Sequence, residues 1–226
     1  MNAADDKTIV KDYFNSTGFD RWRRIYGGGE VNKVQLDIRN GHQQTVETVL
    51  NWLQDDNLTG MSICDAGCGV GSLSIPLAQA GAKVYASDIS EKMVEEAKRT
   101  AAELADTNYL TLAVQDLEHL SGNYHTVICL DVLIHYPQDQ AAEMISHLCS
   151  LAESRVILSF APKTPALSLL KKIGSFFPGP SKATRAYLHK EADIVKILNN
   201  QGLTIQRQAM TRTRFYFSRI LEAVRT

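Results

Sequence analysis

The sequence contains no apolar run that approaches the roughly 18 residues needed for a membrane-spanning helix. Its first fourteen residues lack the basic start and apolar stretch of a signal peptide, and they are not the Arg- and Ser-rich sequence of a transit peptide. The four cysteines form no CxxC pair, so we expect them to be reduced. These absences predict a soluble intracellular protein.

Neither sign of charge is in excess, because 24 Lys and Arg residues stand against 25 Asp and Glu residues, a formal net charge of −1. A dedicated nucleic-acid-binding protein usually has a clear basic excess, so we expect no nucleic-acid partner. Apolar residues make up 44% of the 226 residues, the balance of an ordinary globular protein. A chain of this length can bury a core without disulfides or metals.

From residue 61 onward, short apolar runs alternate with helical patterns, which predicts an α/β fold with a mostly parallel sheet and helices on both faces. A short link at residues 211–213 predicts that the last two strands form an antiparallel hairpin. The expected strands are residues 61–66, 83–87, 109–114, 126–130, 155–160, 203–210 and 214–224. The expected helices are residues 7–14, 43–53, 73–80, 91–105, 138–152 and 188–200.

Two segments fall outside this alternation. Residues 1–57 carry helical patterns before the first strand, so we expect a helical arm there. Residues 161–187 contain four prolines around the stretch LSLLKKIGSFF and are too long for an ordinary connection. We expect them to form a lid or substrate arm within one domain of residues 1–226, and a small satellite core under a loop is the alternative.

The most informative segment is MSICDAGCGVGSLS, residues 61–74, where an apolar strand leads into Asp65 and then into Gly67, Gly69 and Gly71. Glycines are needed where the backbone turns left-handed or closely approaches a ligand. The helix that starts after them supplies free N–H groups for an anion. Three glycines in register after an acid predict a ligand site.

The spacing D-x-G-x-G-x-G differs from the dinucleotide pattern G-x-G-x-x-G, because position 72 is serine. This disfavours an NAD-dependent oxidoreductase. An acid two residues before the first glycine would repel a pyrophosphate, but it can accept a hydrogen bond from the ammonium group of an amino acid. The pattern therefore predicts a nucleoside ligand with an amino-acid tail.

DAGCGVG resembles the glycine-rich motif of the class I S-adenosylmethionine-dependent methyltransferases, whose fold is Rossmann-like. The resemblance implies S-adenosylmethionine as cofactor, S-adenosylhomocysteine as its product, and no protein-bound metal. It implies that Asp88 binds both ribose hydroxyls and that Asp116 binds the adenine amino group. The cofactor-binding residues expected in this way are Asp65, Gly67, Gly69, Asp88, Ile89, Met93, Asp116, Leu117 and Leu130.

Further segments make nearly the whole chain similar to the magnesium-protoporphyrin IX O-methyltransferases, among them DRWRRIYG, GHQQTV, CLDVLIHYP, FPGPSKATRAY and TRFYFSRILEAVR. The sequence GGGEVN at residues 27–32 departs from that family. The resemblance implies methylation of one propionate of magnesium protoporphyrin IX, giving the monomethyl ester in chlorophyll biosynthesis. It also implies contact with the magnesium chelatase large subunit, and a location in the cytoplasm or peripheral to photosynthetic membranes.

A propionate has a pKa near that of glutamate, about 4.3, so it is already ionised at neutral pH. The enzyme must then align the carboxylate with the methyl group rather than remove a proton. We expect Tyr26 and His135 to be the catalytic residues, each donating a hydrogen bond to a carboxylate oxygen. The expected apolar walls are Leu167, Leu169, Leu170, Ile173, Phe176 and Phe177, and the candidates for the second propionate are Arg21, Arg23, Arg24, Lys171 and Lys172.

Two other functions fit the same fold. One is methylation of a phenolic quinone precursor, which would need a base because a phenol has a pKa near 10, and His135 could be that base. The other is a catalytically silent scaffold, which would not need Asp65, Asp88 and Asp116, all of which are present.

Overall fold

The structure is a computed structural model that describes residues 3–165, 167–168 and 186–225. Its strands are β1 Ser62–Ala66, β2 Lys83–Asp88, β3 Leu110–Val114, β4 Tyr124–Cys129, β5 Ala152–Phe160, β6 Leu203–Arg212 and β7 Phe217–Arg225. Its α-helices are α1 Ala3–Asn15, α2 Phe19–Tyr26, α3 Lys33–Leu53, α4 Ser74–Gln79, α5 Glu91–Ala102, α6 Gln138–Leu151 and α8 Glu191–Asn200, and two 3₁₀ helices are η1 Leu117–His119 and η2 Leu133–His135.

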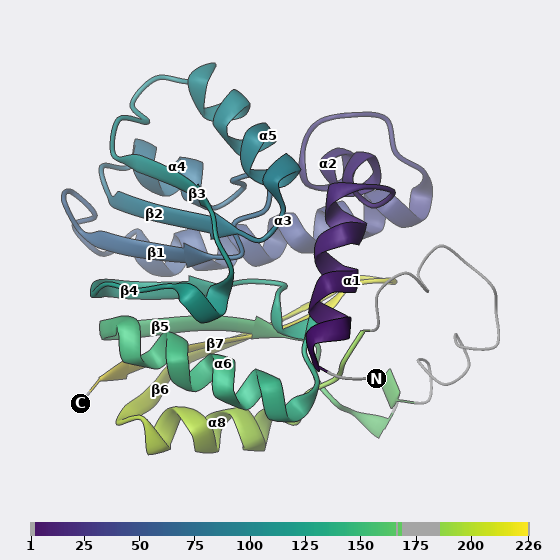
Figure 1. Cartoon of the computed structure of the whole chain (residues 1–226). Helices are drawn as coiled ribbons and strands as arrows, with labels where there is room; N and C mark the ends of the chain where they lie inside the picture. Colours follow the sequence, from purple (N-terminus) through teal and green to yellow (C-terminus); the bar gives the residue numbers. More distant parts are fainter. Residues whose placement is uncertain (1–2, 166, 169–185, 226) are drawn as a thin grey trace.

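Within these residues, seven strands form one sheet in the order β3-β2-β1-β4-β5-β7-β6 (Figure 1). Strands β1 to β5 pair in parallel, whereas β7 is antiparallel to both β5 and β6. The predicted parallel sheet with a reversed C-terminal hairpin is confirmed. Helices α1 and α2 stand at the end of the sheet where the parallel strands finish, which places residues of the N-terminal segment over those strand ends.

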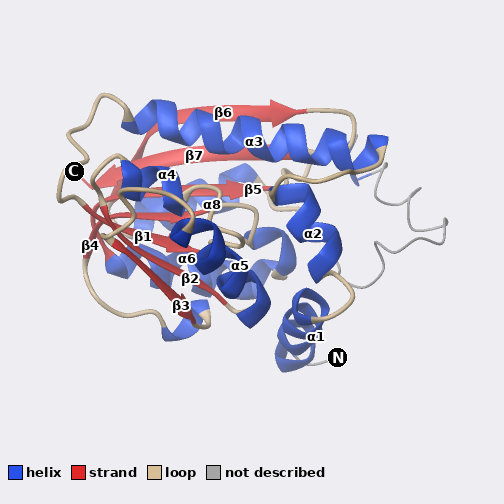
Figure 2. Ribbon diagram, turned by 90° about the horizontal axis from the view of Figure 1, so that it is seen from above, coloured by secondary structure: helices blue, strands red, loops and turns tan. Residues whose placement is uncertain are grey.

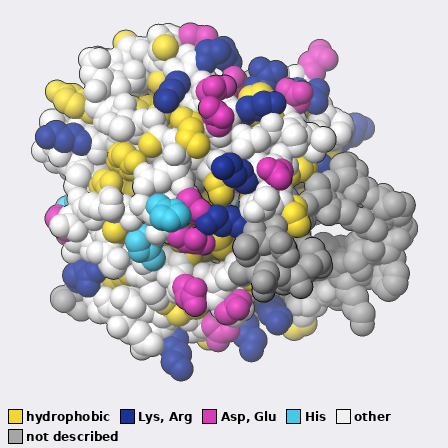
Figure 3. All heavy atoms as spheres, in the orientation of Figure 1, with side chains coloured by type: hydrophobic (Ala, Val, Ile, Leu, Met, Phe, Trp, Pro, Cys, Tyr) yellow, Lys and Arg dark blue, Asp and Glu magenta, His cyan; other side chains and the backbone are white. Residues whose placement is uncertain are grey.

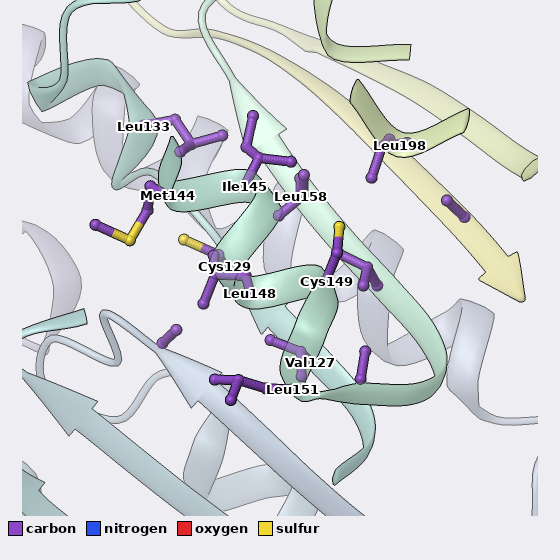
Figure 4. Packing of buried hydrophobic residues seen from close by; sticks show 14 of the residues in the cluster. Val127, Cys129, Leu133, Met144, Ile145, Leu148, Cys149, Leu151, Leu158 and Leu198 are labelled. Carbon is purple, nitrogen blue, oxygen red and sulfur yellow. The ribbon is translucent and has the colours of Figure 1, made fainter. Parts of the chain in front are cut away.

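Helices cover both faces of the sheet, as expected, and each face has its own buried cluster. Figure 2 shows α3 running along β6 and β7. On that face Ile128 of β4 packs among buried residues of α3 and α4. On the other face Val127 and Cys129 of β4 pack with Leu148 and Cys149 of α6, as Figure 4 shows. Successive residues of one strand thus serve opposite faces, which is the pattern of a sheet buried between two helical layers.

The N-terminal segment contains more helix than the sequence pattern predicted. Helix α2 was not predicted, and α3 begins at Lys33, ten residues before the expected start. Asn32 caps α3, since its side chain accepts a hydrogen bond from the Gln35 N–H (2.9 Å) and the Gln35 side chain accepts one from the Asn32 N–H (3.1 Å). This capping box fixes the helix start where apolar periodicity is weak.

The turn of the C-terminal hairpin lies at residues 213–216 rather than at the expected 211–213. Asp37 of α3 stabilises it, because its carboxylate accepts from the Thr213 hydroxyl (2.6 Å) and from the Phe215 N–H (2.7 Å). These bonds lower the pKa of Asp37, chiefly through the Thr213 hydroxyl. A partner about 176 residues away in the sequence therefore sets the length of this turn.

The outer surface shows no dominance of one charge in the view of Figure 3, where basic and acidic side chains are interspersed. Among the helices in the described part of the chain, none combines the length and apolar character required to span a bilayer.

Candidate active site

The glycine-rich turn follows β1 with all three of its glycines in the left-handed region, at φ +89° for Gly67, +52° for Gly69 and +85° for Gly71. A Cβ at Gly67 would lie 2.1 Å from Cγ2 of Val132, so the close approach of two chain segments excludes a side chain there. At Gly69 the nearest atom is 3.9 Å away, in the ring of Tyr26. Gly67 is thus required for packing, whereas Gly69 faces open space.

Two buried carboxylates flank this turn. Asp65, 2% exposed, accepts a hydrogen bond from the Ser74 hydroxyl, and burial raises the pKa of Asp65 to about 6. Asp88 accepts from the Gly69 N–H (3.0 Å) with one oxygen and from the Ser90 N–H (2.8 Å) with the other. Burial raises the pKa of Asp88, while these N–H groups lower it. Asp88 therefore holds the glycine turn against the start of α5.

A first cavity opens at the ends of β1, β2 and β4. The residues lining it include the predicted cofactor residues Asp65, Gly67, Gly69, Asp88, Ile89, Met93, Leu117 and Leu130, together with Lys7, Phe14, Tyr26, His42, Asp131 and His135. Strand ends and the glycine turn thus bring together eight of the nine positions expected to bind the cofactor.

Asp116 is the predicted cofactor residue that does not line the first cavity. Its carboxylate forms an ion pair with Lys7 of α1, and Lys7 also pairs with Glu118 at 2.9 Å. Lys7 itself lines the cavity. These ion pairs hold α1 at the end of the cavity next to Leu117, beside Asp116, the acid that was expected to bind the adenine amino group.

A second cavity adjoins the first and has mainly aromatic and aliphatic walls. Its described lining is Tyr13, Arg21, Trp22, Tyr26, Ile38, Asp131, Ile134, His135, Phe160, Ala161, Leu167, Ala186, Leu188, Arg214, Phe215, Tyr216, Phe217 and Ser218. The two cavities share Tyr26, Asp131 and His135, and we call this place the junction.

Of the residues expected to wall a substrate site, only Leu167 can be placed. The other five expected wall residues and both lysine candidates for the second propionate lie outside the described residues. These are Leu169, Leu170, Ile173, Phe176 and Phe177, and Lys171 and Lys172. Arg21 lines the second cavity, but Arg23 and Arg24 line neither cavity. The Arg24 Nε donates to the carbonyl of Asp20 (3.0 Å), and Arg23 lies 4.0 Å from Glu96.

Tyr26 and His135, the two predicted catalytic residues, meet at the junction. His135 in η2 has its ring 5.5 Å from that of Phe14 at 83°, and its Nδ1 is buried without a hydrogen-bond partner among the described residues. Burial lowers the pKa of His135 to about 4, so its ring is neutral at pH 7. Burial and the charges of Asp131 and Asp88 raise the pKa of Tyr26, which keeps its hydroxyl protonated.

Asp131 was not predicted as a site residue, yet it is the centre of a buried hydrogen-bond network. It has a left-handed φ of +59° and accepts from the Tyr216 hydroxyl (2.8 Å), His42 Nδ1 (2.8 Å) and the Ser159 hydroxyl (3.2 Å). Burial raises its pKa, but these donors outweigh burial and hold it below the ordinary value. A non-glycine residue in this conformation is uncommon, and here the hydrogen bonds to its carboxylate and the bond from its N–H to the Ser159 hydroxyl oxygen (2.8 Å) support it.

The network joins three sequence segments that share no local pattern. GHQQTV contributes His42 and also Thr45, whose hydroxyl lies 3.0 Å from that of Tyr216. A Cβ at Gly41 would come within 2.4 Å of the Tyr216 ring, which explains the glycine there. The His42 ring also contacts the Tyr26 ring, with centroids 4.3 Å apart and the planes tilted by 45°, so the network supports the junction.

These features agree with the comparisons with known proteins. Residues 129–225 match the family model described as magnesium-protoporphyrin IX methyltransferase C-terminus, and residues 63–154 match a methyltransferase domain. The chain is 70% identical to a magnesium-protoporphyrin O-methyltransferase of Synechocystis sp., over 99% of this chain and 98% of that protein. The chain belongs to the magnesium-protoporphyrin O-methyltransferase family.

Other members and a solved structure support the assignment to this family. A chloroplastic magnesium protoporphyrin IX methyltransferase of Arabidopsis thaliana is 60% identical, over 97% of this chain and 71% of that protein. A crystal structure of the Synechocystis PCC 6803 enzyme with bound SAH has a TM-score of 0.91 and 68% identity, covering 97% of this chain and all of that chain. The predicted class I methyltransferase fold is therefore confirmed.

A comparison also bears on the alternative function, methylation of a phenolic quinone precursor. A ubiquinone biosynthesis O-methyltransferase of Xanthomonas euvesicatoria is 31% identical over 66% of this chain and 65% of that protein. The relation to an enzyme of quinone biosynthesis is thus more distant than the relation to the magnesium-protoporphyrin O-methyltransferase family.

His135 and Asp65, both at the site, have opposite effects on how the folding stability changes with pH. The pKa of His135 falls from 6.5 to about 4 on folding, so its contribution to stability is complete above about pH 6.5 and is lost as the pH falls through about 4. The pKa of Asp65 rises from 3.8 to about 6, so its contribution is complete below about pH 3.8 and is lost as the pH rises through about 6.

We expect His135→Gln to remove the part of the stability loss at acid pH that arises from protonation of His135. Between pH 7 and pH 5 the variant should lose less free energy of unfolding than the unmodified protein, by on the order of 1–2 kcal/mol. Asp65→Asn should have the opposite effect, so that this variant loses more free energy of unfolding than the unmodified protein between pH 7 and pH 5. Urea unfolding at several pH values measures the effect of each variant. If the free energies of unfolding of all three proteins change with pH in parallel, the pKa shifts of His135 and Asp65 are contradicted.

Proposed function

We propose that this chain transfers the methyl group of S-adenosylmethionine to one propionate carboxylate of magnesium protoporphyrin IX, giving the monomethyl ester. The observation that carries the proposal is the junction, where a cavity built from the glycine turn and strand ends meets an aromatic cavity at Tyr26, Asp131 and His135. Membership in the magnesium-protoporphyrin O-methyltransferase family supports the choice of acceptor.

The residues of the first cavity fit the cofactor. S-adenosylmethionine, when bound, supplies a methyl group activated by a sulfonium. The open space beside Gly69 admits a ligand close to the backbone, and the buried carboxylate of Asp65 can accept from an ammonium group. Asp88 at the end of β2 can accept from ribose hydroxyls, while Ile89 and Leu117 provide apolar contact for a base.

At the junction the protein aligns a nucleophile that is already charged. The hydroxyl of Tyr26 and an N–H of the neutral His135 can each donate to one oxygen of the propionate, which leaves the other oxygen free to attack. His42, Tyr216 and Ser159 donate to the carboxylate of Asp131, which reduces its repulsion of the propionate. The apolar walls of the second cavity exclude water from the reacting carboxylate.

A phenolic acceptor is less well served by this site. A phenol with a pKa near 10 requires a base, and His135 with a pKa of about 4 is a weak one. Steady-state assays with magnesium protoporphyrin IX and with a phenolic quinone precursor separate the two functions. We expect kcat/KM to favour the porphyrin strongly, and a preference for the phenol would overturn the proposal.

We also propose the structural role of the N-terminal helices, the partner and the location that the family resemblance implies. In this proposal α1 and α2 form a helical arm over the cavities, the magnesium chelatase large subunit delivers the porphyrin, and the protein works in the cytoplasm or at the periphery of photosynthetic membranes. The support is family membership and the contact of Lys7 with Asp116. Co-purification of the two proteins, with and without porphyrin, tests the delivery step.

Replacing Asp88 with alanine should weaken cofactor binding at least tenfold. The change removes a carboxylate expected to accept two ribose hydroxyls, each such bond being worth about 1.5–3 kcal/mol, and it also frees the N–H groups of Gly69 and Ser90. Isothermal calorimetry with S-adenosylhomocysteine measures the loss, with Asp139→Ala on the exposed start of α6 as the matched control. Equal affinity of the Asp88 variant and the control would remove this acid from the cofactor site.

A further inference from the structure

The second cavity has two arginines in its lining, and the charge of one of them, Arg214, lowers the pKa of the nearby Asp37 of α3. Arg21 of α2 and Arg214 of the turn between β6 and β7 both line it. The Arg21 Nε is buried without a hydrogen-bond partner in the part of the chain that the structure describes. Neither guanidinium takes part in an ion pair among the described residues. Arg21 is partly buried and Arg214 is exposed, and a ligand that brings a carboxylate into the cavity would supply a counter-ion that neither guanidinium has in an ion pair of the described residues.

Both arginines are supported by aromatic rings of the same cavity wall. The guanidinium carbon of Arg21 lies 5.7 Å from the centroid of Trp22, and that of Arg214 lies 5.5 Å from the centroid of Phe215. The turn that carries Arg214 is fixed by Asp37, whose carboxylate accepts from the backbone N–H of Phe215 at 2.7 Å and of Arg214 at 3.3 Å. A guanidinium held near a ring keeps its N–H groups for a carboxylate.

The acid at the other end of the cavity is already hydrogen-bonded. Asp131 is the one acid in the described lining of the second cavity, and His42, Tyr216 and Ser159 all donate to it. Arg21 and Arg214 therefore leave the second cavity with an excess of positive charge. An acceptor with a second carboxylate would supply a counter-ion to Arg21 and Arg214 themselves, which a carboxylate bound at the junction alone does not.

We propose that Arg21 and Arg214 bind the propionate that is not methylated, and this proposal rests on the proposed function. The two propionates of a protoporphyrin lie along one edge of the macrocycle, so the second carboxylate must lie beside the junction. Arg21 shares α2 with Tyr26, and Arg214 lies two residues before Tyr216, which donates to Asp131. Each arginine thus comes from an element that also builds the junction.

This pair of arginines also limits the reaction to one propionate. After the first transfer, the remaining free carboxylate is the one that Arg21 and Arg214 hold. A second transfer requires the monoester to turn, which would place an uncharged ester against two arginines and leave both without a counter-ion. The turned monoester is therefore bound poorly, and the diester does not form.

The test uses Arg21→Met and Arg214→Met, which keep most of the alkyl chain, and two acceptors. These are magnesium protoporphyrin IX and the magnesium complex of a porphyrin with one propionate. We expect KM for the diacid to rise at least about tenfold, KM for the monoacid to stay unchanged, and dimethyl ester to appear in the mass spectrum of the diacid reaction. Arg24→Met on the same helix and Arg212→Met in the same hairpin are matched controls, because neither lines the cavity.

Equal increases of KM for both acceptors would show that the arginines only pack against the wall, and would overturn the proposal. Unchanged KM values without dimethyl ester would overturn it as well. Failure of the unmodified protein to methylate either porphyrin would instead contradict the proposed function, so the two failures are distinguishable.

Discussion

Tyr26→Phe and His135→Ala should each lower kcat by about 100-fold while the affinities for cofactor and porphyrin change little. Each variant removes a donor expected to fix the approach of the propionate, and a misplacement of about 1 Å at a reacting centre costs a factor of this size. The protonated Tyr26 hydroxyl and the neutral His135 ring, both at the junction, are the structural basis of the expectation. Single-turnover rates together with equilibrium binding separate alignment from affinity.

Two residues that line neither cavity provide matched controls for these variants. Tyr109→Phe removes a hydroxyl from a residue that is 59% exposed, and His125→Ala removes an imidazole that lies near the start of β4, 2.9 Å from the Thr126 hydroxyl. Both should retain full activity. If Tyr26→Phe and His135→Ala instead weaken binding and leave kcat intact, the two residues hold ligands and do not align the nucleophile.

Gly67→Val should abolish detectable cofactor binding and lower the melting temperature, whereas Gly69→Ala should reduce binding and leave the fold largely intact. The difference follows from their surroundings, since a Cβ at Gly67 meets Val132 at 2.1 Å and a Cβ at Gly69 meets nothing closer than 3.9 Å. At Gly69 the new methyl group enters the first cavity, and the left-handed φ of +52° adds about 1 kcal/mol of strain.

Thermal unfolding with and without S-adenosylhomocysteine measures both effects of the glycine variants. Gly81→Ala is a control with a similar φ of +91°, and it lies away from the cavities. Gly67→Val protein that unfolds normally and binds the cofactor normally would count against the role of the turn. It would also contradict the contact with Val132 and hence the packing of the junction against the glycine segment.

The parts of this molecule that the sequence predicted are those whose cause is local. The parallel strands follow from short apolar runs, and the glycine turn follows from the spacing of Asp65 and three glycines within seven residues. The start of α5 has a local cause as well, because the Ser90 side chain accepts a hydrogen bond from the Met93 N–H. Each of these features depends on residues that are neighbours in the sequence.

The parts that were missed depend on partners far apart in the chain. His42 and Asp131 are 89 residues apart, and Tyr216 is 85 residues beyond Asp131, so no local pattern shows that they bond. Each lies in a segment that carried the family resemblance, which singled out the segment without giving the residue a role. Helix α2 was missed because eight residues are too few for a helix to form on its own, and its contacts with α1, α3 and α5 stabilise it.

The position of the transferred methyl group tests the central claim most directly. The protein is incubated with magnesium protoporphyrin IX and S-adenosylmethionine that carries a deuterated methyl group, and the product is examined by mass spectrometry and NMR. The account predicts one deuterated methyl per macrocycle, bonded to a propionate oxygen as an ester. Absence of transfer, or a label on any other atom of the macrocycle, would contradict it.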